Sequence, residues 1–430
     1  MAQDTVHSFL REKVSLRRGV KFDGDEMNLF LPQSPGTVAE MSVLTNVKNN
    51  IMTPRANKPS ISIIQDALLG SFLLTRGWTK IRKEDFCDAA VVGMCWECID
   101  RKFAVMKKYH PKRKTPYWGK VLFSLLLPDD LNYRKENKAD PKEPIFEIRQ
   151  GVIISGAANK AILGDTPHGL IQILYKEYGN ERCAQFITNL QRMVVLWICR
   201  YGFSIGWSDC LAEVTEEVQR DLAKARLEIE VAQQTEHDPR ILELRTNIIL
   251  NRAKDMGHRI CQEKLRPENR LKQMVESGSK GNYVNIAQIT SILGQQNMRG
   301  RRIEKSISFG TRSLPQFRGG DDSPAARGFV SSSYRQGLNP AEFWFHAVGG
   351  REGLADTAIR TADSGYLSRR MVKSMEDARV HHDGTVRTAQ GAILQFAYGE
   401  DGMDGAELYP FGGKPFFADV HQIAARLNNL

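Results

Sequence analysis

The sequence predicts an α+β protein that is built from several structural units. Its 430 residues are more than one hydrophobic core usually holds, which indicates two to four units. Apolar and polar residues alternate after residue 145 and predict strands, whereas residues 211–265 and 338–380 show helical spacing. The chain is therefore expected to combine strands, a helical hairpin and one very long helix.

The composition predicts hydrophobic cores and a basic surface. Hydrophobic residues make up 41% of the sequence, and a formal charge of +10 with a pI near 9.2 is compatible with a polyanionic partner. Seven cysteines without a regular spacing predict free thiols in a reducing compartment. No apolar run approaches the roughly 18 residues of a membrane span, so no membrane contact is expected.

An acidic turn near the N-terminus is the first candidate site. Asp23 and Asp25 flank Gly24, which lets the backbone bend so that both carboxylates can reach one hard cation such as Mg²⁺. The same pattern occurs in surface turns and calcium loops. The spacing alone therefore leaves these alternatives open.

The run from residue 51 to 75 is expected to start extended, because it holds two prolines, and to continue as a helix. The apolar residues at helical steps in this run are Ile61, Ile64 and Leu68. Residues 129–144 are polar and rich in turn formers, which predicts an exposed loop. The strands that follow are expected to give way to a helix after His168.

Cys95 and Cys98 form a C-x-x-C pair that is compatible with a zinc or redox site. A structural zinc site needs four ligands, and no second pair stands at a suitable distance in the sequence. We therefore favour buried cysteines in a helix.

Residues 211–265 are expected to form an antiparallel helical hairpin with charged, solvated outer faces. Asp238 and Pro239 interrupt the helical pattern between its two halves. The apolar stripe of the first half consists of Leu211, Val214, Val218, Leu222, Ala225 and Ile229.

A cation on an open turn follows the hairpin. Lys280 stands between Gly278 and Gly281, just before a helix expected around residues 286–293. Farther on, the arginines at 299, 301 and 302 could meet phosphates, although surface arginines usually do not.

The longest predicted helix runs from residue 338 to 380. Asn339 can serve as the N-cap, Pro340 takes the first helical position, and Glu342 can reach back as in a capping box. From Pro340 to about residue 378 the helix would extend roughly 58 Å. Its four internal glycines each cost about 1 kcal/mol relative to alanine, so something must require them.

One face of this helix carries small side chains that lead to two arginines. The residues on it are Ala358, Thr361, Ala362, Gly365, Tyr366, Arg369 and Arg370. Small side chains beside two guanidinium groups suit a helix against which a nucleic-acid backbone lies closely. Because an amphipathic helix with two arginines is more often packed or solvated, the pattern alone does not decide.

Residues 337–377 closely resemble the bridge helix in the largest subunit of multisubunit DNA-directed RNA polymerases; they read GLNPAEFWFHAVGGREGLADTAIRTADSGYLSRRMVKSMED. In that family the bridge helix crosses the active-site cleft, and its centre contacts the template base being copied. The resemblance places Thr361, Ala362 and Tyr366 on the template, with Arg369 and Arg370 near the nucleic-acid backbone.

The resemblance covers residues 22–404. Over this range the sequence is more similar to the largest subunits of eukaryotic messenger-RNA polymerases and of large DNA viruses than to the bacterial subunit. It implies a mixed pore domain, a helical-hairpin funnel domain and the bridge helix. The implied segments are a non-family N-terminus (1–21), the tail of the catalytic metal loop (22–50), the pore domain (51–200), the funnel (201–300), a connecting region (301–337), the bridge helix (338–380) and the truncated start of a cleft domain (381–430).

The acidic turn matches the family's metal loop only in part. In the family three aspartates hold the catalytic Mg²⁺; Asp23 and Asp25 match two of them, while Lys21 stands where the third is expected. An ammonium group there would repel Mg²⁺. Our hypothesis is that the gene is interrupted at the active-site codons and that the missing ligand is supplied upstream. The alternative is a real, diverged fragment.

The resemblance implies template-directed nucleotidyl transfer with paired Mg²⁺ ions, a DNA template, an RNA product and nucleoside triphosphates. Lys280, Gln295 and Gln296 would line the nucleotide channel. The second-largest subunit and other polymerase subunits would be partners, in the nucleus or in a cytoplasmic virus factory or virion. Since the clamp and the trigger loop are missing, this chain alone is expected to be inactive. The alternatives are a non-catalytic scaffold that docks into the polymerase or binds nucleic acid, and a stand-alone basic nucleic-acid binder.

Overall fold

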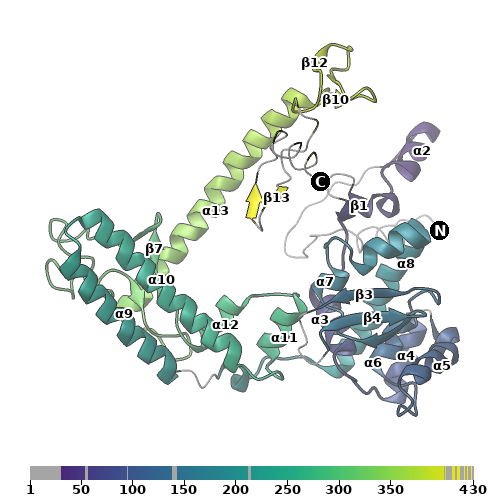
Figure 1. Ribbon diagram of the computed structural model, residues 1–430, viewed down its shortest axis with the longest axis horizontal. Helices are drawn as coiled ribbons and strands as arrows, with labels where there is room; N and C mark the ends of the chain where they lie inside the picture. Colours follow the sequence, from purple (N-terminus) through teal and green to yellow (C-terminus); the bar gives the residue numbers. More distant parts are fainter. Residues whose placement is uncertain are drawn as a thin grey trace. The chain divides into compact units, whose positions relative to one another are not determined.

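The computed structural model describes residues 31–53, 57–93, 95–137, 143–211 and 215–400, together with positions 402, 409–411, 414–416, 421, 424 and 428 (Figure 1). The chain divides into two compact units, Met1–Phe345 and His346–Leu430, which are described separately below. Helices and antiparallel strands occur together, which confirms the predicted α+β class. Among the described residues, no helix is both long and apolar enough to span a membrane.

The first unit begins with short elements that lead into a helical core. These are α2 (Pro35–Val43), η1 (Val47–Asn50), β1 (Met52–Thr53) paired with β2 (Lys58–Pro59), α3 (Gln65–Thr75), α4 (Lys83–Val92), η2 (Trp96–Cys98), α5 (Ile99–Tyr109) and α6 (Gly119–Ser124). Helix α3 forms the centre of this core, because every residue from Ala67 to Thr75 is buried. It packs closely on α8 (Leu170–Tyr201): a Cβ added at Gly70 would lie 2.4 Å from Val194 Cγ1.

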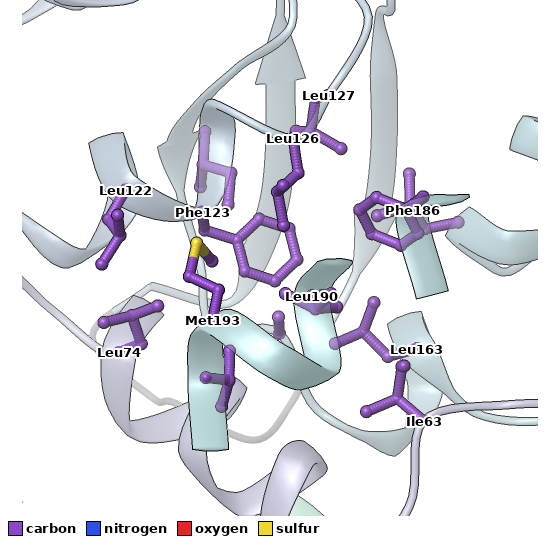
Figure 2. Packing of buried hydrophobic residues seen from close by; sticks show 14 of the residues in the cluster. Ile63, Leu74, Leu122, Phe123, Leu126, Leu127, Leu163, Phe186, Leu190 and Met193 are labelled. Atoms are coloured by element: carbon purple, nitrogen blue, oxygen red, sulfur yellow. The ribbon is translucent and has the colours of Figure 1, made fainter. Parts of the chain in front are cut away.

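A three-stranded antiparallel sheet, in the order β3-β4-β5, packs on these helices. Its strands are β3 (Tyr133–Glu136), β4 (Ile145–Arg149) and β5 (Val152–Ser155), and α7 (Lys160–Leu163) follows. Figure 2 shows the side chains that fill the core: Leu74 from α3, Leu122 and Phe123 from α6, Leu163 from α7, and Phe186, Leu190 and Met193 from α8. Phe146 and Ile148 of β4 and Val152 and Ile153 of β5 belong to the same cluster, so helices and strands share one hydrophobic core.

The predicted helical hairpin is confirmed. Helices α9 (Thr215–Thr235) and α10 (Pro239–Lys264) lie side by side and antiparallel, and the chain reverses between them at Asp238 (Figure 1). Leu222, Ala225 and Ile229 are buried, as the stripe predicts. Leu211 is exposed and precedes the hairpin, so it was wrongly included in the stripe.

Short elements complete the first unit after the hairpin. They are α11 (Arg270–Ser277), α12 (Tyr283–Thr290), β6 (Gly294–Gln295) paired with β9 (Phe329–Val330), and β7 (Asn297–Met298) paired with β8 (Arg301–Arg302); η3 (Trp207–Cys210) lies just before the hairpin. Helix α12 ends earlier than the predicted helix around 286–293, because residue 294 already belongs to β6.

The long helix is present as α13 (Pro340–Met375), which begins in the first unit and continues into the second. Its 36 residues correspond to about 54 Å, slightly less than predicted. In the second unit, β10 (Arg379–Val380), β11 (Val386–Arg387) and β12 (Ile393–Gln395) form a small antiparallel sheet, and β13 (Tyr409–Phe411) pairs with β14 (Lys414–Phe416).

Three local predictions are wrong. Residues 129–144 are not one loop, because Tyr133–Glu136 pairs with β4 and the Tyr133 side chain is buried. Ile61 and Ile64 precede α3 rather than lying within it, and Ile64 is exposed. Cys95 is buried as expected, but it lies before the short 3₁₀ turn η2 and not in an α-helix.

Candidate functional site

The predicted metal ligands Asp23 and Asp25, and Lys21 beside them, lie outside the residues that the structure describes. Within the described part of the chain, no group of three or more His, Cys, Asp or Glu side chains is arranged to hold a metal ion. The predicted template and nucleotide residues can be located on α13 and around α12.

The start of α13 is fixed by a buried capping box. The Glu342 backbone N–H donates to Asn339 Oδ1 at 2.8 Å, and the Asn339 N–H donates to Glu342 Oε2 at 3.1 Å, as the sequence predicts. Glu342 is only 7% exposed, and its second oxygen accepts from the backbone N–H groups of Ser331 and Ser332. This carboxylate therefore ties the first turn of α13 to the chain just after β9.

The predicted template face of α13 is exposed within the second unit. Thr361, Ala362, Tyr366, Arg369 and Arg370 are all exposed, and the Arg370 guanidinium lies 5.4 Å from the centre of the Tyr366 ring. Neither arginine pairs with a carboxylate of the described residues. Both guanidinium groups are therefore available to phosphates.

The glycines of α13 are equally open. A Cβ added at Gly350, Gly353 or Gly365 would meet no heavy atom within 4 Å in the structure. No packing contact in the described chain explains these glycines. Because no side chain covers them, these glycines leave the helix backbone open to close approach.

Lys280 lies on a turn whose shape depends on glycine. Gly278 ends α11 at φ 74°, a left-handed conformation, and Gly281 adopts the same φ before Asn282 caps α12. The Lys280 side chain is exposed. This geometry confirms the predicted open turn, whereas the role of Lys280 stays a prediction.

The sequence did not predict that Lys160 lies beside this turn. A Cβ added at Gly278 would lie 2.6 Å from the Cβ of Lys160, so the stem of Lys160 packs directly over Gly278. Two exposed lysines from distant parts of the sequence therefore lie at one turn. No local signal links them, because the contact depends on how α7 packs.

Gln295 and Gln296 lie at the opposite end of α12 from Lys280. The buried Gln295 side chain donates to the carbonyl oxygens of Gln296 and Arg327, both at 2.8 Å. The half-buried Gln296 side chain donates to the Gly294 carbonyl at 3.1 Å. In this structure Gln295 holds two strands together, and a contact of either glutamine with nucleotide stays a prediction.

Comparisons with known proteins identify the family. The model for RNA polymerase Rpb1, domain 3, matches residues 50–210; that for domain 4 matches residues 222–330; and that for domain 5 matches residues 337–423. These matches follow one another in the order of the domains. They include most of the helical hairpin, the Lys280 turn and α13.

Two curated relatives agree with this match. A probable DNA-directed RNA polymerase II subunit RPB1 homolog from Invertebrate iridescent virus 6 is 37% identical over 447 residues, which cover 95% of this chain and 42% of the relative. DNA-directed RNA polymerase II subunit RPB1-B from Trypanosoma brucei brucei is 36% identical over 413 residues, which cover 92% of this chain and 23% of the relative. The chain thus spans less than half the length of either relative. Together with the three successive domain matches, these similarities show that the chain belongs to the family of largest subunits of multisubunit DNA-directed RNA polymerases.

Proposed function

We propose that this chain takes part in template-directed nucleotidyl transfer, as a section of a polymerase largest subunit that forms part of the RNA-synthesis site. The observation that carries this proposal is α13, an exposed rod with a face of small side chains, inside the match to Rpb1 domain 5. Its open glycines, and two arginines that pair with no carboxylate among the described residues, suit a closely bound nucleic-acid strand.

In this proposal α13 is the bridge helix. Thr361, Ala362 and Tyr366 contact the template base, while Arg369 and Arg370 hold phosphates of the backbone. A base can approach Thr361 and Ala362 closely because neither side chain extends far from the helix. The Tyr366 ring, with Arg370 beside it, offers a surface for stacking.

The Lys280 turn is proposed to bind the triphosphate of the incoming nucleotide, with Gln295 and Gln296 farther along the same channel. Lys160 deepens this proposal, because its stem packs over Gly278 and brings a second ammonium group to the turn. Lysine binds phosphate as a flexible point charge, so two exposed lysines on one turn suit a mobile polyanionic ligand.

The metal assignment rests on the resemblance and on residue chemistry. Asp23 and Asp25 would provide carboxylate oxygens to Mg²⁺, the hard cation that such ligands prefer. When bound there, paired Mg²⁺ ions would polarise the attacking 3′ hydroxyl and the leaving pyrophosphate. Because Lys21 would repel the ion, a further ligand from other polypeptide would be needed.

The proposed setting is an assembled enzyme with a second-largest subunit and smaller subunits. We also propose the domain assignment for this setting: pore domain 51–200, funnel 201–300, connecting region 301–337 and bridge helix 338–380. The similarity of the sequence to eukaryotic and viral subunits favours the nucleus or a viral compartment as the place of action.

The test uses the assembled polymerase that contains a tagged form of this chain. RNA extension on a primed template is measured while Mg²⁺ is titrated, with and without Asp25→Asn. The expected result is at least a hundredfold loss of extension in the variant at low Mg²⁺. Subunit composition after purification serves as the control for assembly.

A non-catalytic scaffold is the second candidate, because Lys21 stands where a third carboxylate is expected. A scaffold would leave the elongation rate unchanged in Asp23→Ala and Asp25→Asn. The Lys21→Asp variant separates the two functions further: the polymerase proposal expects extension at lower Mg²⁺ concentrations, whereas a scaffold shows no change in Mg²⁺ dependence.

A further inference from the structure

A concentration of positive charge lies far from α13 in the sequence, at the end of α5 and in the loop after it. This basic segment comprises residues 107–118, which read KKYHPKRKTPYW. Its cations are Lys107, Lys108, Lys112, Arg113 and Lys114. The sequence contains no Asp or Glu from residue 101 to 128, so no acidic residue within the segment offsets them.

The cations that flank the basic segment form ion pairs, whereas no ion pair among the described residues involves the cations within it. Arg101 and Lys102 both pair with Asp129, at 2.9 and 2.7 Å, and the buried Lys120 pairs with Glu143. The five cations of the segment pair with no carboxylate among the described residues. All four lysines are exposed to solvent. Charge that is grouped and unpaired favours an anionic ligand over an internal structural role.

Aromatic rings anchor Arg113 and His110 of the basic segment. The Arg113 guanidinium carbon lies 4.6 Å from the centre of the Trp78 ring and 4.3 Å from that of Trp118. The His110 ring packs edge-on against Trp78 at 4.5 Å, and its Nε2 lies 3.1 Å from the Ile154 carbonyl oxygen. A segment anchored in this way loses little conformational entropy when a ligand binds.

The shape and the aromatic content identify the class of anion. Tyr109, His110, Pro111, Lys112 and Arg113 line a hollow of about 460 Å³. Tyr109, at the edge of the hollow, is 37% exposed; the Arg149 guanidinium lies 5.9 Å from the centre of its ring, which leaves the uncovered part of the ring for a ligand. Proteins that bind single-stranded nucleic acid usually combine lysines along the phosphate backbone with an aromatic ring on which a base stacks. An acidic peptide would satisfy the charges but would have no particular use for the ring.

We propose that the basic segment binds single-stranded nucleic acid, with its lysines on the phosphates and Tyr109 against a base. The site lies in the region matched by Rpb1 domain 3 and involves none of the α13 residues or Lys280 assigned above. It does not depend on the proposed catalytic role, because binding can be measured without RNA synthesis.

The test measures binding of a fluorescent oligouridylate to the full chain by anisotropy, over KCl concentrations of roughly 50 to 300 mM. The variant Lys112→Gln plus Lys114→Gln removes two phosphate contacts. We expect binding about tenfold weaker or more near 0.1 M KCl, and a slope of log K against log salt reduced by about 1.4. Tyr109→Ala should weaken binding about fivefold and leave the slope unchanged, because stacking releases no counterions.

The matched control removes the same charge elsewhere. Lys83→Gln plus Lys176→Gln replaces two exposed lysines of α4 and α8. Equal weakening by both double variants would overturn the proposal, since net charge alone would then explain binding. Unchanged RNA binding together with loss of a co-purifying polymerase subunit would also overturn it, in favour of an acidic protein partner.

Discussion

Arg302 shows how a single buried charge can organise a region. Its side chain is 4% exposed, and its guanidinium donates to Glu243 through Nε at 2.9 Å and through a terminal nitrogen at 2.5 Å. Burial raises the pKa of Glu243, but Arg302 and Arg327 together more than offset this, so the pKa lies below its ordinary value. Arg302 thus joins β8 to α10 and is not free for phosphate.

Replacing Arg302 by alanine should destabilise the fold by about 2–4 kcal/mol, because Glu243 would lose its buried partner. Urea unfolding of the full chain, followed by circular dichroism, measures the effect. The neighbouring Arg301 is exposed, and Arg301→Ala should change stability by no more than about 0.5 kcal/mol. Similar losses in both variants would contradict the assigned pairing.

The cysteines differ in reactivity because they differ in burial. Burial raises the pKa of the Cys95 and Cys183 thiols to about 12, whereas Cys199 is exposed. At pH 8 a thiol with a pKa near 12 carries roughly a thousand times less thiolate than a thiol at its ordinary value. Alkylation followed by peptide mass mapping should therefore label Cys199 well before the two buried cysteines. Equally fast labelling of Cys95 in the folded chain would contradict this expectation.

Asp383 gives a pH-dependent contact in the small sheet of the second unit. Hydrogen bonds from the Thr385 hydroxyl and backbone N–H, together with the Arg387 guanidinium, lower the pKa of Asp383 to about 2. Because the pKa is lowered on folding, the contact stabilises the sheet above the ordinary value of 3.8 and loses its effect as the pH falls toward 2.

A carboxyl-carbon NMR titration measures this pKa directly. Thr385→Val should raise the pKa of Asp383 toward its ordinary value, because the hydroxyl donor is the largest cause of the shift. Thr388→Val, a change of the same kind at a residue outside this contact, should leave it near 2. An unchanged value in Thr385→Val would contradict the assignment.

Among the elements, α13 contains internal glycines that lower the stability of the helix but leave its surface open to other molecules. Each internal glycine costs about 1 kcal/mol, and a Cβ would meet nothing at Gly353 or Gly365. Replacement of either by alanine should therefore slow hydrogen exchange in α13 of the free chain by roughly fivefold.

The two glycines should differ in the assembled polymerase. Gly365 lies on the face with Thr361 and Ala362, while Gly353 lies about 120° around the helix. We expect Gly365→Ala to reduce RNA elongation at least tenfold and Gly353→Ala to change it less than twofold. Equal elongation rates in the two variants would show that no nucleic acid lies against the small-residue face.

Elements differ in how well the sequence predicts them. The hairpin and α13 could be predicted because helical spacing is a local property that repeats over many residues. Strand β3 could not, because the polar run around it shows no alternation and its pairing with β4 depends on distant contacts. Tyr133 was the one cue, since its ring is buried and its hydroxyl donates to the His168 carbonyl at 2.9 Å.

For the whole molecule, the family could be recognised from the sequence because long stretches of it are similar to the family's sequences. The domain comparisons confirm this recognition. The chain spans only 42% and 23% of the lengths of its two relatives. The packing of Lys160 over Gly278 could not be predicted. It joins α7 to the turn after α11, two segments of the first unit that no sequence pattern relates.

That contact leads to a prediction for the assembled enzyme. If Lys160 and Lys280 bind the same triphosphate, Lys280→Ala should raise KM for nucleoside triphosphates about tenfold, which corresponds to about 1.4 kcal/mol. Lys160→Ala should raise KM less, and the double variant should raise it by less than the product of the two changes, because the lysines share one ligand. Lys176→Ala, at an exposed position of α8, is the control. Single variants whose KM stays within twofold of the unchanged enzyme would remove both lysines from the nucleotide site.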